Sequence, residues 1–256
     1  MIRQALLAIQ FLTIFPLRIR KMDEKDLAGS MAFYPLVGVF LGTILTGMAG
    51  FFHLFLPPIL MVLFLLLFWT IFTGGLHLDG VADTLDGFIG GKNREATLSI
   101  MRDSAIGTMG TLGIFFVLAL KGAALFSFED RGGVTPPLLG LILIFVLATG
   151  RYLMVLGAFV SRYPHAEGAG KSYIGKIPLP VFLTASLLML LVAVVTLQLK
   201  GLFLLLTALG WSALWILYCR RRIGGMTGDT LGALAEVSEA VLLVLICRFL
   251  RVTFII

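Results

Sequence analysis

Apolar residues fill most of the chain in long runs, and short polar segments separate these runs. A transmembrane helix needs about 20 mostly apolar residues. Seven runs approach this length, and we predict a membrane-spanning helix in each: 30–52, 58–76, 107–128, 137–160, 179–199, 202–218 and 231–250. The predicted fold is an all-α, polytopic helical bundle in a lipid bilayer, formed by a single domain, 1–256.

An additional apolar run at the N-terminus is shorter than these seven. The segment from Ala5 to Pro16 is too short to span a bilayer, and Gln10 and Pro16 interrupt it. No small-residue cleavage site follows, which argues against a cleaved signal peptide. We therefore predict an interfacial helix that lies flat on the membrane.

The composition agrees with a membrane protein. Apolar residues make up 59% of the chain and charged residues 13%, and the mean hydropathy is +1.03. Soluble domains carry about 25% charged residues, so a soluble globular protein is excluded. Cys219 and Cys247 lie within or beside apolar runs, which indicates packing rather than a disulfide or a metal site.

The basic residues predict the orientation in the membrane. The formal net charge is +6, and most basic residues fall on the face that carries the N-terminus when the seven spans are threaded. Cytoplasmic loops retain such residues, so we expect the N-terminus at the cytoplasmic side of a bacterial or archaeal inner membrane and no nucleic-acid partner. Arg248 and Arg251 fit this threading least well; an even number of spans, with a re-entrant last helix, would accommodate them.

Three aspartates directly follow the second predicted span. Asp79, Asp83 and Asp86 share one helix face, because offsets of four and seven residues bring side chains together at about 100° per residue. Carboxylates this close raise one another's pKa unless a cation lies among them. Mg²⁺ prefers oxygen ligands and often binds a few carboxylates together with substrate phosphates. We predict a Mg²⁺ site here; the alternative is an acidic face solvated by water.

Two further segments carry charged side chains. Arg102 suits bidentate binding of a phosphate, and Asp103 either completes the metal shell or pairs with Arg102. Further candidates for phosphate binding, which the orientation rule explains equally well, are Lys92, Arg94, Lys171 and Lys176. Asp229 and Glu236 share a face of the last predicted helix.

Glu236 lies about two helical turns into this apolar run, where an unpaired carboxylate is costly. We expect it to face a cavity, a cation such as Arg151, or the metal site. The acidic and basic clusters at one membrane border together indicate an enzyme that acts on a phosphorylated substrate.

Several motifs occur in a recognisable order along nearly the whole chain: Phe11–Pro16, Phe33–Gly38, Gly74–Gly87, Met101–Thr108, Tyr173–Ile177 and Met226–Ala233. In these motifs the sequence resembles the cobalamin synthase family, the integral membrane enzymes that join the two halves of vitamin B12. The resemblance implies a Mg²⁺-dependent transfer. In this reaction adenosylcobinamide-GDP and α-ribazole, or its 5′-phosphate, give adenosylcobalamin or its phosphate together with GMP, so the implied partners are corrinoid and nucleoside substrates.

This reaction gives the candidate residues their roles. We predict that Asp79, Asp83 and Asp86 hold Mg²⁺ against the diphosphate, and that Asp103 or Asp229 completes the shell or acts as the base. Substrate binding is assigned to Arg102, Lys176, Thr227, Thr230 and Glu236. The sequence leaves the oligomeric state open, a homo-oligomer included.

Two alternative functions compete with the cobalamin synthase interpretation. The CDP-alcohol phosphotransferases also use spaced aspartates with Mg²⁺, but their pattern has two residues between the first two aspartates and a following Ala-Arg, whereas three residues separate Asp79 from Asp83 and no Ala-Arg follows. A cation-coupled transporter would place its ion site near the bilayer midplane, whereas most of the acidic candidates map to the border.

Overall fold

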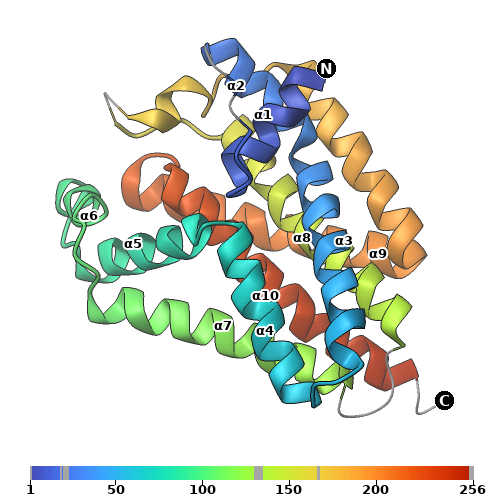
Figure 1. Cartoon of the computed structure of the whole chain (residues 1–256). Coiled ribbons are helices and arrows are strands. Elements are labelled where there is room, and N and C mark those ends of the chain that lie inside the picture. Colours follow the sequence, from blue (N-terminus) through green and yellow to red (C-terminus); the bar gives the residue numbers. More distant parts are fainter. Residues whose placement is uncertain (1, 18, 20–22, 130–134, 166–167, 254–256) are drawn as a thin grey trace.

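The computed structural model describes residues 2–17, 19, 23–129, 135–165 and 168–253, and these residues form helices with no strand among them. The prediction of an all-α bundle is confirmed (Figure 1). The helices are α1 (Ile2–Leu12), α2 (Glu24–Ser30), α3 (Tyr34–His53), α4 (Pro58–Phe72), α5 (Leu76–Gly90), α6 (Arg94–Ile100), α7 (Thr108–Glu129), α8 (Pro136–Val160), α9 (Leu179–Ile223) and α10 (Gly228–Thr253), with short 3₁₀ turns at Met31–Phe33 and Ala169–Ser172.

Five helical segments are long and apolar enough to cross a membrane: Lys25–His53, Thr108–Phe128, Pro136–Val160, Leu179–Ile223 and Gly228–Phe249. The pair α4 and α5 passes the same test only together, with a bend of 87° between the two helices. The chain is therefore an integral membrane protein. The number of its spans stays a prediction.

Helix α9 contains a sharp break that divides it into two halves. Gln198 has φ 54° and ψ −134°, a conformation outside the helical region. A Cβ on Gly201 would lie 2.3 Å from the carbonyl oxygen of Ala193, so only glycine fits where the second half of α9 begins beside the end of the first. The two halves correspond to the predicted helices 179–199 and 202–218.

Helix α8 forms the centre of the bundle, and most of its side chains are buried. Helix α3 packs against it at very short range, because a Cβ on Gly38 would lie 2.5 Å from the backbone of Ala148. Gly42 makes a similar contact with Ile144 one turn later. Small residues at such positions let membrane helices approach closely.

The predicted span 58–76 is too long. Helix α4 ends at Phe72, and Gly74 and Gly75 then take left-handed φ values of 62° and 67°. Glycine adopts this conformation without the steric cost of a side chain. The turn directs α5 away from the axis of α4, which places the aspartates of α5 outside the five apolar spans.

The N-terminal helix is present, and one of its faces packs on the protein. Leu7, Ala8 and Leu12 are buried, and Arg3 forms an ion pair of 2.8 Å with Asp26 of α2. The placement of α1 at the membrane interface stays a prediction. Some basic residues used to predict the orientation lie outside the described residues: Arg18, Arg20, Lys21 and Arg131.

Candidate functional site

Helices α5 and α10 cross in direct backbone contact. A Cβ on Gly80 of α5 would lie 2.6 Å from the carbonyl oxygen of Asp229, and a Cβ on Gly232 of α10 would lie 3.1 Å from the Cα of His77. The two glycines therefore allow the acidic face of α5 to meet the first turn of α10. The predicted acidic residues of two distant motifs come together at this crossing.

Four carboxylates at the crossing form what we call the acidic cluster: Asp79, Asp83, Asp86 and Asp229. Burial raises the pKa of Asp83 to about 7, and the neighbouring carboxylates of Asp79, Asp229 and Asp86 add to this shift in that order. Asp79 is exposed, whereas the other three are half-buried. The cluster is therefore accessible and carries mutually repelling charges.

Asp86 also holds the start of α7. Its two carboxylate oxygens accept the backbone N–H groups of Gly107, at 2.7 Å, and Gly110, at 2.8 Å. These are unpaired donors at a helix N-terminus, where a negative charge is favourable. Each oxygen keeps a second lone pair, so the capping contacts fix Asp86 and are compatible with its predicted role as a metal ligand.

Thr227 and Thr230 form a reciprocal cap at the start of α10. The backbone N–H of Thr227 donates to the Thr230 hydroxyl at 2.8 Å, and the N–H of Thr230 donates to the Thr227 hydroxyl at 3.2 Å. The Thr230 hydroxyl donates to the carbonyl of Thr227, and the Thr227 hydroxyl donates to Asp229 at 3.2 Å. Both hydroxyl protons are used within this turn, and the predicted contacts with substrate stay a prediction.

The chemistry of the acidic cluster fits Mg²⁺ better than a softer metal. All of its donors are carboxylate oxygens, which hard cations prefer. Among the residues that the structure describes, no three His, Cys, Asp or Glu side chains form a ready-made metal site. Mg²⁺ binding by the acidic cluster therefore stays a prediction.

The predicted phosphate-binding residues lie in loops around this end of the bundle. Arg102 is exposed and hydrogen-bonds to Tyr163. Asp103 is exposed too, and its carboxylate accepts the backbone N–H of Ala105 at 3.0 Å. Lys176 is exposed and follows Gly175, whose φ is 77°. Both basic side chains are thus exposed to solvent, and phosphate binding by Arg102 and Lys176 stays a prediction.

The structure adds three aromatic residues that the sequence reading missed. Burial raises the pKa of Tyr173 to about 12, with smaller contributions from Asp229 and Tyr163. Burial also raises the pKa of Tyr163, against the opposing effect of Arg102, and lowers that of His165. Tyr173 opens one of the family motifs, which is the signal that could have identified it; no local pattern distinguishes Tyr163 or His165.

Two arginines near the site bind backbone carbonyls. Arg94, a predicted phosphate ligand, donates to the carbonyls of Ile223, at 2.8 Å, and Pro164, at 3.0 Å. Arg222 donates to the carbonyls of Phe88, at 2.9 Å, and Gly91. These contacts join the ends of α5 and α9 to the neighbouring loops, so both arginines stabilise the backbone around the site.

Glu236 lies in a buried ion cluster, which we define as Lys121, Arg151, Glu236 and Glu239. The Lys121 ammonium donates to one oxygen of Glu236 and one of Glu239, each at 2.6 Å. Arg151 donates to the other oxygen of Glu239. Of the alternatives expected for Glu236, the structure shows a cation beside it; this cation is Lys121, whereas Arg151, the example named from the sequence, pairs with Glu239. The substrate contact predicted for Glu236 stays a prediction.

The comparison with known families covers nearly the entire chain. A family model described as "Cobalamin-5-phosphate synthase" matches residues 4–247. The chain belongs to the cobalamin-5-phosphate synthase family. The resemblance drawn from the motifs is thus confirmed, and the family membership supports neither a CDP-alcohol phosphotransferase nor a transporter.

Three similar proteins share the name adenosylcobinamide-GDP ribazoletransferase. The protein from Syntrophobacter fumaroxidans is 38% identical over 92% of this chain and 94% of its own length. The protein from Desulforamulus reducens is 39% identical, covering 94% of each chain. A third, from Klebsiella pneumoniae strain 342, is 36% identical over 95% of this chain and 98% of its own. No solved structure matches the chain.

Proposed function

We propose that this member of the cobalamin-5-phosphate synthase family transfers α-ribazole, or its 5′-phosphate, to adenosylcobinamide-GDP. The observation that carries the proposal is the family match over residues 4–247, together with the acidic cluster at the crossing of α5 and α10. A ribazole hydroxyl attacks the phosphorus attached to the cobinamide. The new O–P bond forms as the bond between the two phosphates breaks, and GMP leaves with that electron pair.

Phosphoryl transfer needs mainly positioning and neutralisation of charge. Asp79 and Asp83, with Asp86 fixed beside them, would hold Mg²⁺. When bound, this ion would offset the negative charge of the diphosphate. Arg102 and Lys176, both exposed at this end of the molecule, would bind further phosphate oxygens. The hydrogen bond with Tyr163 limits the motion of Arg102.

The transfer also needs a general base that accepts the proton of the attacking hydroxyl. Asp229 stands on α10 opposite Asp83, and the Thr227 hydroxyl donates to one of its oxygens at 3.2 Å. This contact orients the carboxylate, so we assign the proton of the attacking hydroxyl to Asp229. Asp103 is the alternative base, but it lies exposed in a turn. Thr227 and Thr230 then act by fixing the first turn of α10.

We also propose that the site lies at the cytoplasmic side of the membrane. The loops around the acidic cluster carry Lys92, Arg102, Arg162 and Lys176, and basic loops are retained in the cytoplasm. Nucleotide substrates are made in that compartment. Cysteine labelling at Lys176→Cys in inverted and right-side-out vesicles would test the orientation.

The transfer itself is tested with the purified protein in detergent. Adenosylcobinamide-GDP and α-ribazole are supplied with Mg²⁺, and GMP and the corrinoid product are separated by chromatography. We expect equal amounts of both products, loss of turnover with EDTA, and recovery when Mg²⁺ is restored. Turnover of a CDP-alcohol substrate, with none of the corrinoid, would overturn the proposal.

A further inference from the structure

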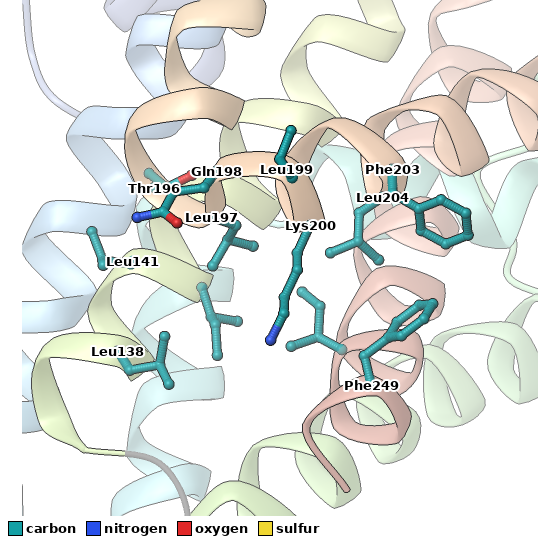
Figure 2. A pocket seen from close by; sticks show the side chains of 12 residues that line it. Leu138, Leu141, Thr196, Leu197, Gln198, Leu199, Lys200, Phe203, Leu204 and Phe249 are labelled. Carbon is teal, nitrogen blue, oxygen red and sulfur yellow. The ribbon is translucent and has the colours of Figure 1, made fainter. Parts of the chain in front are cut away.

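A large cavity lies at the break of α9, between α8 and the end of α10. Its volume is about 750 Å³, within the range of roughly 300–1,000 Å³ that is common for ligand pockets. Apolar side chains form most of the lining, among them Leu138, Ile142, Leu204 and Phe249. Figure 2 shows the ammonium of Lys200 pointing into the space between the leucines of α8 and the two phenylalanines.

The Lys200 cavity, as we name it, is far from the acidic cluster. Asp229 of the acidic cluster lies in the first turn of α10, whereas Ile246 and Phe249, which line the cavity, lie near the other end of the same helix. At 1.5 Å per residue these two places are roughly 25–30 Å apart along α10. The cavity is thus at the opposite end of the bundle and is separate from the reaction site.

A second cavity in the same molecule provides an internal comparison. It lies between α4 and α7, its volume is about 620 Å³, and its lining is apolar apart from Thr70. Lipid chains fit the lining of either space, because apolar side chains form most of it. A charged lining residue distinguishes the Lys200 cavity, and among the described residues Lys200 has no acidic partner.

We propose that the Lys200 cavity binds a phospholipid with a net negative headgroup. The phosphate pairs with the Lys200 ammonium, and an acyl chain lies between the leucines of α8 and the edge-to-face pair of Phe203 and Phe249, whose ring centroids are 5.4 Å apart. A lysine at a membrane border keeps its stem among apolar groups and its charge at headgroup level. The charge complementarity selects an anionic lipid over a zwitterionic one.

The backbone supports a specialised role for this region. Gln198 is the one non-glycine residue with positive φ in the described part of the chain, and it lines the cavity. A strained conformation of this kind persists only where the surrounding structure holds it. Lys200 follows this break by two residues, and its side chain lines the cavity.

The proposal is tested by measuring lipid bound to the purified chain by native mass spectrometry. Phosphatidylglycerol and phosphatidylcholine with the same acyl chains are offered at equal mole fractions. We expect about fivefold more bound phosphatidylglycerol, the preference typical of one well-placed cation. Lys200→Gln should abolish the preference, Lys200→Arg should retain it, and Lys25→Gln should retain it as a matched loss of an exposed lysine elsewhere.

A second pair of variants tests whether the cavity itself is occupied. Leu141→Trp fills the Lys200 cavity without changing charge and should lower phosphatidylglycerol binding, whereas Leu63→Trp in the α4–α7 cavity should leave the headgroup preference unchanged. The proposal is overturned if the wild-type chain binds both lipids equally or if Lys25→Gln loses the preference as Lys200→Gln does. Competition by soluble glycerol phosphate as effective as that of the lipid would overturn it too.

Discussion

Two groups of carboxylates in this molecule have opposite surroundings. In the buried ion cluster, two cations neutralise Glu236 and Glu239, and all four side chains are at most 3% exposed. In the acidic cluster, four carboxylates approach one another at the end of the bundle, and none of them forms an ion pair with a described cation. The protein therefore balances its charges in the core and leaves them unbalanced at the border.

This difference indicates which group interacts with something outside the chain. A buried carboxylate without a partner would be strongly destabilising, so Glu236 and Glu239 must be satisfied by the protein itself. The carboxylates of the acidic cluster repel one another in the folded state, and the hydrogen bonds that Asp86 and Asp229 accept from neutral donors leave this charge unneutralised. Perturbed groups of this kind are typical of functional sites, which supports the assignment of the cluster to metal and substrate.

The largest expected effect on stability comes from Glu239→Gln. Glu239 accepts hydrogen bonds from both Lys121 and Arg151, so its neutralisation leaves two buried cations with one carboxylate. We expect a loss of about 3–5 kcal/mol in the free energy of unfolding. Denaturant titration in detergent would measure it, with the exposed Glu95→Gln as a control. Wild-type stability of Glu239→Gln would show that the network is not needed.

Neutralisation of a carboxylate in the acidic cluster should lower turnover without lowering stability. Asp83→Asn removes a charge from a group of like charges, so the folded protein should be as stable as wild type or more so. Its turnover should fall by about 10²–10³-fold, the usual effect of removing one group that stabilises transition-state charge. GMP release and unfolding are measured on one preparation. Full activity at limiting Mg²⁺ would remove Asp83 from the metal site.

Glu236→Gln should lower the free energy of unfolding by less than Glu239→Gln does. Lys121 keeps its bond to Glu239 in this variant, so we expect a cost of about 1–3 kcal/mol, the penalty for a weakened buried hydrogen bond. Turnover per folded molecule should stay at the wild-type value. A raised KM with unchanged unfolding would instead indicate that Glu236 contacts substrate, as the sequence predicts.

The sequence could predict the helices because apolar runs of sufficient length report directly on membrane burial. The ends of α7 and α8 lie within one residue of the predicted bounds, and the shared face of the α5 aspartates follows from helical periodicity alone. The bend after α4 was missed, because two glycines in an otherwise apolar run do not distinguish a turn from a tightly packed helix. Their positive φ values appear only in the structure.

The sequence could not predict which distant residues form ion pairs, for a different reason. Arg151 and Lys121 are both basic residues within apolar runs, and local patterns do not say which of them meets Glu236. The contact depends on how α7, α8 and α10 pack, across a separation of 115 residues. The same holds for Tyr163, which reaches Arg102 from another loop.

Thr227→Ala should have the smallest effect of these variants, and it tests whether the cap of α10 also positions Asp229 for catalysis. Thr227 caps α10 and donates to Asp229, so its removal should cost about 1 kcal/mol of stability. Turnover should fall a few-fold, on the order of one hydrogen bond of ~1 kcal/mol, because Asp229 loses the donor that orients it. Thr227→Ser keeps the hydroxyl and should restore both quantities. If Thr227→Ala lowers stability alone, the hydroxyl serves only the helix, and Asp229 does not depend on it for its position.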